Sequence, residues 1–148
     1  MNVADIPFNR FLGLRADGCV LTLPADAKYQ NHLGTVHAGA QFALAEAASG
    51  QWLLGRFGDA AGDYLAVVRH VDLKYRRPAT GELVARAEVS EDEARQFRDT
   101  LERRGRASIE VRVQVMGPDQ SATLEATFEW FAQRARPLKT SAASCPGI

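Results

Sequence analysis

The sequence predicts an α+β domain, in which a largely antiparallel sheet with one apolar face wraps along one enclosed helix. Residues 36–57 are apolar nearly all round, which is typical of a helix surrounded by other structure. After them, apolar and polar residues alternate along four segments, as in strands that bury one face. The helix would be about 30 Å long and the strands about 35 Å, so the sheet can follow the helix.

Short elements are expected before the long helix. Residues 5–11 predict a short helix that packs three apolar side chains, those of Ile6, Phe8 and Phe11. Residues 12–23 predict a strand or a bent pair of strands, because the turn signal Asp17-Gly18 interrupts them. Residues 24–36 are polar and irregular, and they lead into the long helix, which is closed by Gly55 and Gly58.

Four strands and a surface helix are expected after the long helix. The apolar positions of the strands are Val67, Val71, Leu73 and Tyr75; Leu83, Ala85, Ala87 and Val89; Ala107, Ile109, Val111, Val113 and Val115; and Leu124, Ala126, Phe128 and Trp130. Residues 78–81 and 117–120 predict the turns of two hairpins. Residues 91–104 predict the surface helix, with a narrow apolar stripe of Ala94, Phe97 and Leu101. Its oppositely charged pairs at a spacing of four are Glu91 with Arg95, Arg98 with Glu102, and Asp99 with Arg103.

One domain is expected, covering residues 1–135. The length of 148 residues suits a single domain, which can bury roughly two thirds of its unfolded surface without a metal or disulfide. Residues 136–148 lack periodicity and are expected to form a flexible tail. A sheet that curls round one helix leaves edge strands to be covered. Dimerisation that joins two sheets edge to edge would cover them.

The charge balance argues against two classes of partner. Lys and Arg total 18, as do Asp and Glu, so the formal net charge is zero. Proteins that bind nucleic acid by bulk charge are usually basic, and binders of membrane surfaces carry polybasic clusters. Residues 38–55 have a single charge, but the polar and small residues among them indicate a buried helix rather than a membrane span. Neither nucleic acid nor a membrane is expected as a partner.

The cysteines and the N-terminus indicate a cytoplasmic protein. Cys19 and Cys145 are widely spaced, which fits neither a disulfide framework nor a zinc site. Free thiols are expected in a reducing cytosol. The first residues lack a basic start followed by an apolar stretch, so no signal peptide is expected. No phosphate loop, metal-ligand cluster or Ser-His-Asp signature is present, and no metal or cofactor is expected.

Glu46 is the most informative single residue. It is the only charge between His37 and Arg56, within a helix that has little exposed surface. An unpaired buried carboxylate costs several kcal/mol, or it takes up a proton instead. Two interpretations remain open at this point, a structural ion pair and a group placed for chemistry.

The start of the long helix is the second candidate feature. Ala38, Gly39 and Ala40 are small, and the first N–H groups of a helix have no partner within it. Such groups can stabilise developing negative charge, although small residues also let a sheet pack closely. His37 and Glu46 lie about 13 Å apart along the helix, on opposite sides of it. If both serve one site, they come from different subunits, at a dimer interface.

The stretch from Asn31 to Gly50 resembles the hotdog-fold acyl-CoA thioesterases of the phenylacetyl-CoA and 4-hydroxybenzoyl-CoA type, or a closely related, less characterised hotdog branch. In that family an Asn or Gln and a Gly precede His-Gly-Gly, and Phe-Ala-Leu-Ala followed by Asp or Glu lies on the central helix. The matching positions are Asn31, Gly34, Thr35, His37, Gly39, Phe42, Ala43, Leu44, Ala45 and Glu46. The resemblance covers residues 10–133 and includes the turn at 77–81. It implies a hotdog fold, an antiparallel sheet wrapped around one long central helix.

The resemblance also implies the roles of individual residues in hydrolysing an aryl or medium-chain acyl-CoA. Glu46 would act as nucleophile or general base, and the backbone N–H of Ala38 in the partner subunit would form the oxyanion hole. His37 would support that turn, and Asn31 would hold the leaving sulfur or the attacking water. The residues expected to contact substrate are Gly39, Ser49 and Gly50. The family implies a homodimer or a dimer of dimers, with CoA as part of the substrate.

Two positions depart from the family pattern. Ala38 stands where a Gly is usual, and Gly50 stands where a hydroxyl residue often follows the carboxylate by four positions. Ser49 supplies a hydroxyl three positions on, but its direction differs by about 100° around the helix. These departures leave an alternative function open, that of a non-catalytic acyl-CoA or lipid-binding hotdog protein. A hotdog dehydratase is disfavoured, because the Pro- and Gly-rich sequence around the histidine of that branch is missing.

Several basic residues are candidates for contacting the CoA phosphates. Arg103, Arg104 and Arg106 cluster at the end of the surface helix, although the helix dipole alone favours basic residues there. Arg76 and Arg77 are equivalent candidates. Arg69 falls on the apolar face of its expected strand, where it would pair with Glu46 or another carboxylate or mark the end of the strand. His70 is expected to be solvated.

Overall fold

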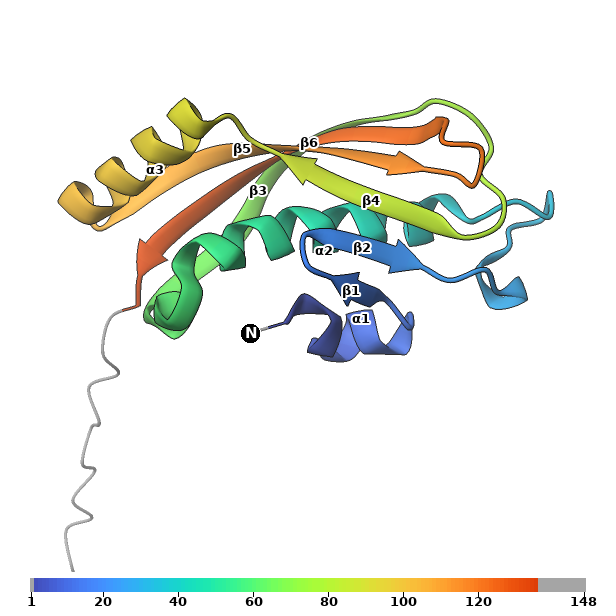
Figure 1. Cartoon of the computed structure of the whole chain (residues 1–148), viewed down its shortest axis with the longest axis horizontal. Helices are drawn as coiled ribbons and strands as arrows, with labels where there is room; N and C mark the ends of the chain where they lie inside the picture. The colour runs from blue at the N-terminus through green and yellow to red at the C-terminus, as the bar shows by residue number, and fades with distance from the viewer. Residues whose placement is uncertain (1, 136–148) are drawn as a thin grey trace, which may run out of the picture.

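A six-stranded sheet arches over one long helix, α2, in the computed structural model (Figure 1). The structure describes residues 2–135, apart from the side chains at positions 59 and 61, and the expected flexible tail at 136–148 lies outside the described residues. The elements in chain order are η1 (Val3–Asp5), α1 (Pro7–Phe11), β1 (Arg15–Asp17), β2 (Val20–Leu23), η2 (Ala27–Tyr29), α2 (Ala38–Phe57), η3 (Gly58–Asp63), β3 (Tyr64–Tyr75), β4 (Leu83–Glu88), α3 (Glu91–Arg104), β5 (Arg106–Met116) and β6 (Ala122–Arg134).

The sheet has the strand order β1-β2-β4-β5-β6-β3, and every neighbouring pair is antiparallel. The α+β class and the hotdog architecture predicted from the sequence are therefore confirmed. The bent pair expected before the helix is the hairpin of β1 and β2, which turns at Gly18. Within residues 2–135, none of the helices has the length and apolar character needed to cross a membrane.

One of the two predicted hairpins is wrong. Residues 117–120 do join paired neighbours, β5 and β6. Residues 78–81 instead connect β3, at one edge of the sheet, to β4, which pairs with β2 and β5. This turn lies near the start of α2, where the carbonyl of Ala79 accepts a hydrogen bond from the N–H of Val36 at 2.8 Å. A Pro-Gly turn signal reverses the chain but does not determine which strand becomes the neighbour.

The alternation predicted along β3 is also wrong in its first half. A bulge between Val68 and His70 shifts the register against β6. Because a one-residue shift moves side chains to the opposite face, Val67 is 53% exposed on the outer face. Arg69 does not reach Glu46. Its guanidinium lies 3.5 Å from the centroid of the Phe131 ring, in a cation–π contact.

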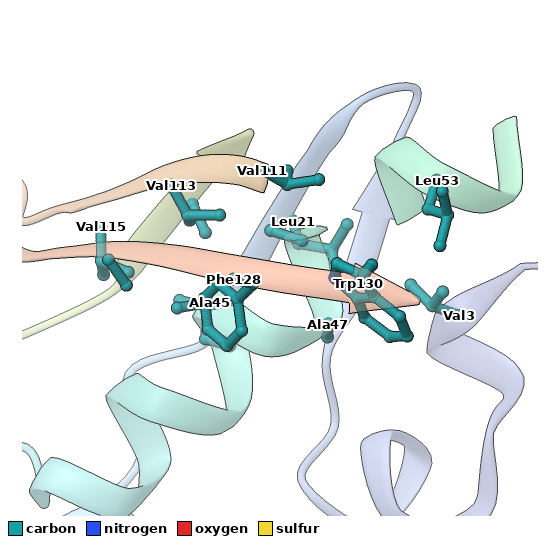
Figure 2. Packing of buried hydrophobic residues seen from close by; sticks show 14 of the residues in the cluster. Val3, Leu21, Ala45, Ala47, Leu53, Val111, Val113, Val115, Phe128 and Trp130 are labelled. Atoms are coloured by element: carbon teal, nitrogen blue, oxygen red, sulfur yellow. The ribbon is translucent and has the colours of Figure 1, made fainter. Parts of the chain in front are cut away.

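The core lies between α2 and the inner face of the sheet (Figure 2). Fully burying one aliphatic or aromatic side chain contributes about 1.5–3 kcal/mol. Side chains of β5 and β6 that are completely or almost completely buried there include Val111, Val115, Leu124 and Phe128. One side of α2 is less covered, because Phe42, Glu46, Trp52 and Leu54 are only half-buried. The helix predicted to be enclosed is therefore only partly covered in the single chain.

The N-terminal segment buries different residues from those predicted. The side chains of Ile6, Phe8 and Phe11 are 38%, 59% and 78% exposed, whereas Val3 and Asn9 are buried. Asn9 is held by its Nδ2, which donates to the carbonyl of Val3 at 2.9 Å. The segment around α1 therefore turns Asn9 inward and leaves these three apolar side chains at the surface.

The surface helix α3 has the predicted bounds and buries the predicted stripe of Ala94, Phe97 and Leu101. Its start is fixed by a capping box, in which Ser90 and Glu93 each bond to the other's backbone N–H. Glu93 also accepts from Arg112 on β5 at 2.7 Å, and this bond together with those from Ser90 lowers its pKa to about 2. The ion pairs predicted at a spacing of four are not those that form. Within residues 2–135, the acidic first turn instead pairs Asp92 with Arg95, Glu91 with Arg56 and Glu93 with Arg112.

Candidate active site

The loop before α2 is organised by Asn31. Its Oδ1 accepts from the backbone N–H groups of Leu33, at 2.9 Å, and Thr35, at 3.2 Å. Its Nδ2 donates to the hydroxyl of Thr35 at 2.9 Å. An Asn side chain that bonds to the backbone two residues on stabilises a tight turn. Asn31 thus shapes residues 31–35, and only one amide hydrogen of its side chain remains to contact a ligand.

His37 caps the start of α2. Its Nδ1 accepts from the N–H of Gly39 at 2.9 Å, so Nδ1 is unprotonated in this arrangement. Its own N–H donates to the carbonyl of Tyr29 at 2.7 Å. A Cβ placed on Gly39 would meet the imidazole at 3.2 Å, with no atom of the sheet within 4 Å. The absence of a side chain at position 39 therefore makes room for the His37 cap rather than for the sheet.

The N–H of Ala38 is the candidate oxyanion donor. Ala38 is exposed, and within residues 2–135 its N–H donates to no acceptor. Its carbonyl accepts from the hydroxyl of Tyr75, the last residue of β3, at 2.9 Å. Burial raises the pKa of this hydroxyl. Tyr75 therefore ties the edge strand to the first turn of α2, and the Ala38 N–H lies at the positive end of the helix dipole.

Glu46 lies two turns further along α2 and is half-buried. Within residues 2–135 no Lys, Arg or His lies within ion-pair distance of it. Burial therefore raises the pKa of its carboxyl group. Of the two interpretations that the sequence leaves open, a structural ion pair finds no partner within this part of the chain.

A cavity of about 290 Å³ opens beside Glu46. Its walls come from the second half of α2, from the N-terminal segment, from the start of β3 and from β6. The lining is largely apolar and includes Val3, Ile6, Leu54, Phe57 and Trp130. A cavity of this size and character is typical of a small-molecule site.

Ser49 and Gly50 lie on different sides of α2. Ser49 is fully buried, and its hydroxyl donates to the carbonyl of Glu46 at 2.7 Å and accepts from Trp130 Nε1 at 2.9 Å. It does not line the cavity. Gly50 does line it, one turn beyond Glu46. The position four residues after Glu46 therefore supplies no hydroxyl group to the cavity.

The two halves of the candidate site are not brought together within one chain. Ala38 and Glu46 are eight residues apart on one straight helix, which corresponds to about 12 Å along its axis. The cluster at the helix start comprises Asn31, His37, Ala38 and Gly39, whereas Glu46 and Gly50 border the cavity. A single active site that uses both parts needs a second copy of the chain.

The candidate contacts for CoA phosphates separate into two regions. Arg76 is engaged by Glu125, with its Nε 2.7 Å from a carboxylate oxygen. Arg77 is exposed beside the turn that contacts the start of α2. Arg103 and Arg104 lie on α3, which packs near the opposite end of α2 (Figure 1). Arg77 is therefore the candidate near the start of α2 that forms no ion pair within residues 2–135.

Three contributors to the site were not predicted as such. Tyr75 and Trp130 were expected only as apolar strand positions, since alternation marks a buried face and not a hydrogen bond. The N-terminal wall of the cavity had no signal at all, because residues 3–9 are distant from α2 in the sequence. Tyr75 did carry a usable signal, because it is a tyrosine at a strand end and a tyrosine hydroxyl usually finds a hydrogen-bond partner when it is buried.

A change of Glu46 to Gln is expected to alter the pH dependence of stability. The buried carboxyl group holds its proton to higher pH in the folded chain than in the unfolded chain, because its folded pKa is raised. The free energy of unfolding should therefore fall as pH rises from the unfolded to the folded pKa, and this loss should disappear in E46Q. Urea unfolding from about pH 4 to about pH 8, at one protein concentration, measures the difference. E102Q, which changes an exposed carboxylate of α3, is the control; a wild-type profile in E46Q would contradict the expectation.

The fold has been seen in other proteins. A Pseudomonas aeruginosa protein of unknown function, described as a probable thioesterase, superposes with a TM-score of 0.78 at 27% identity, over 90% of this chain and 91% of that chain. A Bacillus halodurans protein solved with CoA gives 0.67 at 21% identity, over 84% and 74%. A mutant of a thioesterase enzyme from Staphylococcus aureus gives 0.64 at 15% identity, over 85% and 98%. A family model described as "Domain of unknown function (DUF4442)" matches residues 8–131, and no curated protein matches the chain.

Proposed function

The chain belongs to the DUF4442 family, and from this membership and the geometry of the site we propose that it hydrolyses the thioester of an acyl-CoA to a free acid and CoA. The observation that carries the proposal is Glu46, a half-buried carboxylate with no ion-pair partner in the described chain, at the edge of an apolar cavity. Burying an unpaired carboxylate costs folding free energy, and such groups are concentrated at sites where they take part in chemistry. The proposal requires no cofactor, because CoA is part of the substrate.

Two structural relatives support the class of reaction. The Pseudomonas aeruginosa protein is described as a probable thioesterase, and it shares 27% of its aligned residues with this chain. The Bacillus halodurans protein was solved with CoA, in a fold that superposes over most of this chain. The finer resemblance to the phenylacetyl-CoA and 4-hydroxybenzoyl-CoA type rests on the sequence motif at residues 31–50 and is part of the proposal.

The proposed chemistry uses Glu46 in one of two ways. As a general base, it takes a proton from water while the resulting hydroxide attacks the thioester carbon. The tetrahedral oxyanion then collapses, the C–S bond breaks, and the CoA sulfur takes the proton from Glu46. As a nucleophile, the carboxylate itself displaces the CoA thiolate, and water hydrolyses the resulting anhydride. The raised pKa of Glu46 brings it closer to neutral pH, which favours proton transfer.

The oxyanion donor is proposed to be the N–H of Ala38 in the partner subunit. This N–H lies at a helix start and has no acceptor within residues 2–135, and such a group stabilises the charge that develops on the thioester oxygen. The edge strand β3 has twelve residues and exposes Leu65, Val67 and Tyr75. Long exposed edges of this kind are usually covered. A homodimer, or a dimer of dimers, would cover it and would supply the second half of each site.

The location is proposed to be the cytoplasm. Cys19 is a free, exposed thiol in the turn between β1 and β2. Free thiols of this kind persist in a reducing compartment.

A second candidate function is binding of an acyl-CoA or lipid without hydrolysis. The observation in its favour concerns hydroxyl groups near Glu46. The hydroxyl of Ser49 accepts a hydrogen bond from Trp130, and Gly50, which lines the cavity, has no hydroxyl. A site without a hydroxyl beside Glu46 has one group fewer to position water.

A panel of acyl-CoA substrates tests both functions. The wild-type protein is incubated with straight-chain and aryl acyl-CoAs, and the release of CoA thiol is measured. We expect saturable turnover of at least one substrate. Tight binding in calorimetry without thiol release would support the second function instead. Neither binding nor turnover across the panel would contradict both.

A further inference from the structure

The cavity beside Glu46 follows one face of α2. The helix contributes residues spaced by one, three or four positions, which lie on one side of it: Glu46, Ala47, Gly50, Leu53, Leu54 and Phe57. From the first to the last of these the helix rises about 16 Å. The cavity is therefore a groove along three turns of α2, with the carboxylate at one end, rather than a compact pocket around it.

Gly50 and Trp130 set the width of this groove near the carboxylate. A Cβ at position 50 would lie 3.5 Å from Trp130 Cζ2, 3.7 Å from Cη2, and 3.9 Å from Val3 Cγ1. Figure 2 shows Trp130 beside Val3 at this place in the core. The hydrogen bond from Trp130 Nε1 to Ser49 fixes the position of the indole. A methyl group at position 50 would be in ordinary van der Waals contact with Trp130, so the missing side chain leaves space for about one methyl group between α2 and the indole.

Two stacked rings line the far end of the groove. Phe57, at the end of α2, and Tyr64, at the start of β3, stack with centroids 4.6 Å apart and planes inclined by 12°. Both line the cavity. A molecule that enters from Glu46 therefore meets apolar walls along the groove and two aromatic rings at its far end.

We propose that this groove binds a straight-chain acyl group of medium length, that Gly50 and Trp130 exclude bulky groups next to the carboxylate, and that Phe57 limits the length of the chain. The inference rests on the proposed function and narrows its substrate class from aryl or aliphatic to unbranched aliphatic acyl groups. An extended chain can lie along three helical turns, whereas a bulky aryl or branched group next to the carboxylate would need more room than the methyl-sized space between Gly50 and Trp130.

The test compares G50A with a matched variant, G55A. Both replace Gly by Ala within α2, which favours the helix, but no atom lies within 4 Å of a Cβ at Gly55. The readout is kcat/KM for acetyl-, hexanoyl- and decanoyl-CoA and for one aryl-CoA. We expect the wild type to prefer the longer straight chains. G50A should lose about tenfold or more for these chains relative to acetyl-CoA, because one methyl group in an apolar pocket has an effect of this order. G55A should keep the wild-type profile.

A variant at the far end, F57L, tests the length limit without removing the apolar side chain. It is expected to shift the preference towards chains longer than those the wild type favours.

Wild-type turnover with no preference for straight chains, or a G50A profile equal to that of G55A, would overturn the inference and leave the proposed function standing. If no acyl-CoA is hydrolysed, the proposed function fails. Calorimetry of decanoyl-CoA with the wild type, G50A and G55A then tests whether the groove binds an acyl chain. Equal affinities or no binding would overturn the inference, whereas weaker binding by G50A alone would support it.

Discussion

E46Q is expected to lower kcat/KM for acyl-CoA hydrolysis by roughly 10²- to 10⁴-fold, the usual contribution of a positioned proton-transfer group. Gln has nearly the same shape as Glu, so the walls around position 46 should keep their packing. It cannot take a proton from water, and its amide is a poor nucleophile. Release of CoA thiol measures the rate, and calorimetry shows whether acyl-CoA still binds. The expected variant binds substrate and hardly turns it over.

Two further variants make this result specific. E102Q removes a carboxylate from the exposed face of α3 and should keep wild-type kinetics. E46D keeps the charge but withdraws it by one methylene group, and it should retain more activity than E46Q. Wild-type turnover by E46Q would show that Glu46 is not the reacting group.

A change of Ala38 to Pro is expected to lower kcat by roughly 10²- to 10³-fold, the usual effect of losing one oxyanion donor. Proline deletes the N–H, yet it is well tolerated in this place. Ala38 is the first residue of α2, a position that favours proline. His37 before it has φ −57° and ψ 138°, which is the conformation that a following proline requires. A38G, which keeps the N–H, is the control and should remain active; full activity in A38P would contradict the assignment.

Mixing E46Q with A38P tests whether each site is shared between subunits. A mixed dimer has one site with both groups intact and one site with neither. Random refolding of the two variants together should therefore restore about a quarter of the wild-type activity if the site spans a two-fold interface. If both groups served a site within one chain, the mixture would be as inactive as its components.

The elements that the sequence predicts best are those whose pattern is long and regular. The stripe of Ala94, Phe97 and Leu101 has helical spacing throughout and locates α3 from its first residue to its last. The alternation is equally regular along β5 and along β6 from Leu124 onward. Where the pattern is short, tertiary contacts decide. The apolar residues of α1 remain exposed because the segment is fixed through Val3 and Asn9 instead.

The errors in β3 have a different origin. Val67 and Arg69 follow the correct alternation for a regular strand, but the bulge after Val68 reverses it. No residue type in the sequence marks that bulge, since it arises from the fit to the neighbouring strand. The strand order is similarly hidden, because a turn at 78–81 is compatible with a hairpin and with a crossing to another part of the sheet.

The candidate site could be predicted in part. Glu46 stands out because it is the only charge between His37 and Arg56 in an apolar helix, and the helix geometry alone separates it from Ala38. The indole of Trp130 and the hydroxyl of Tyr75 could not be placed from alternation. Their roles depend on partners distant in the sequence, Ser49 and Ala38.

The position of β3 at the edge of the sheet determines when the domain can be completed during synthesis. Within residues 2–135, β3 pairs with β6 alone, and Tyr64 at its start lies opposite Arg134 at the end of β6. While the ribosome adds the segments between them, β3 has no neighbour in the sheet. Contacts between segments so far apart in the sequence form late, and they lower the folding rate. The nascent chain therefore keeps its longest apolar edge unpaired until the last strand emerges, a period in which aggregation competes with folding.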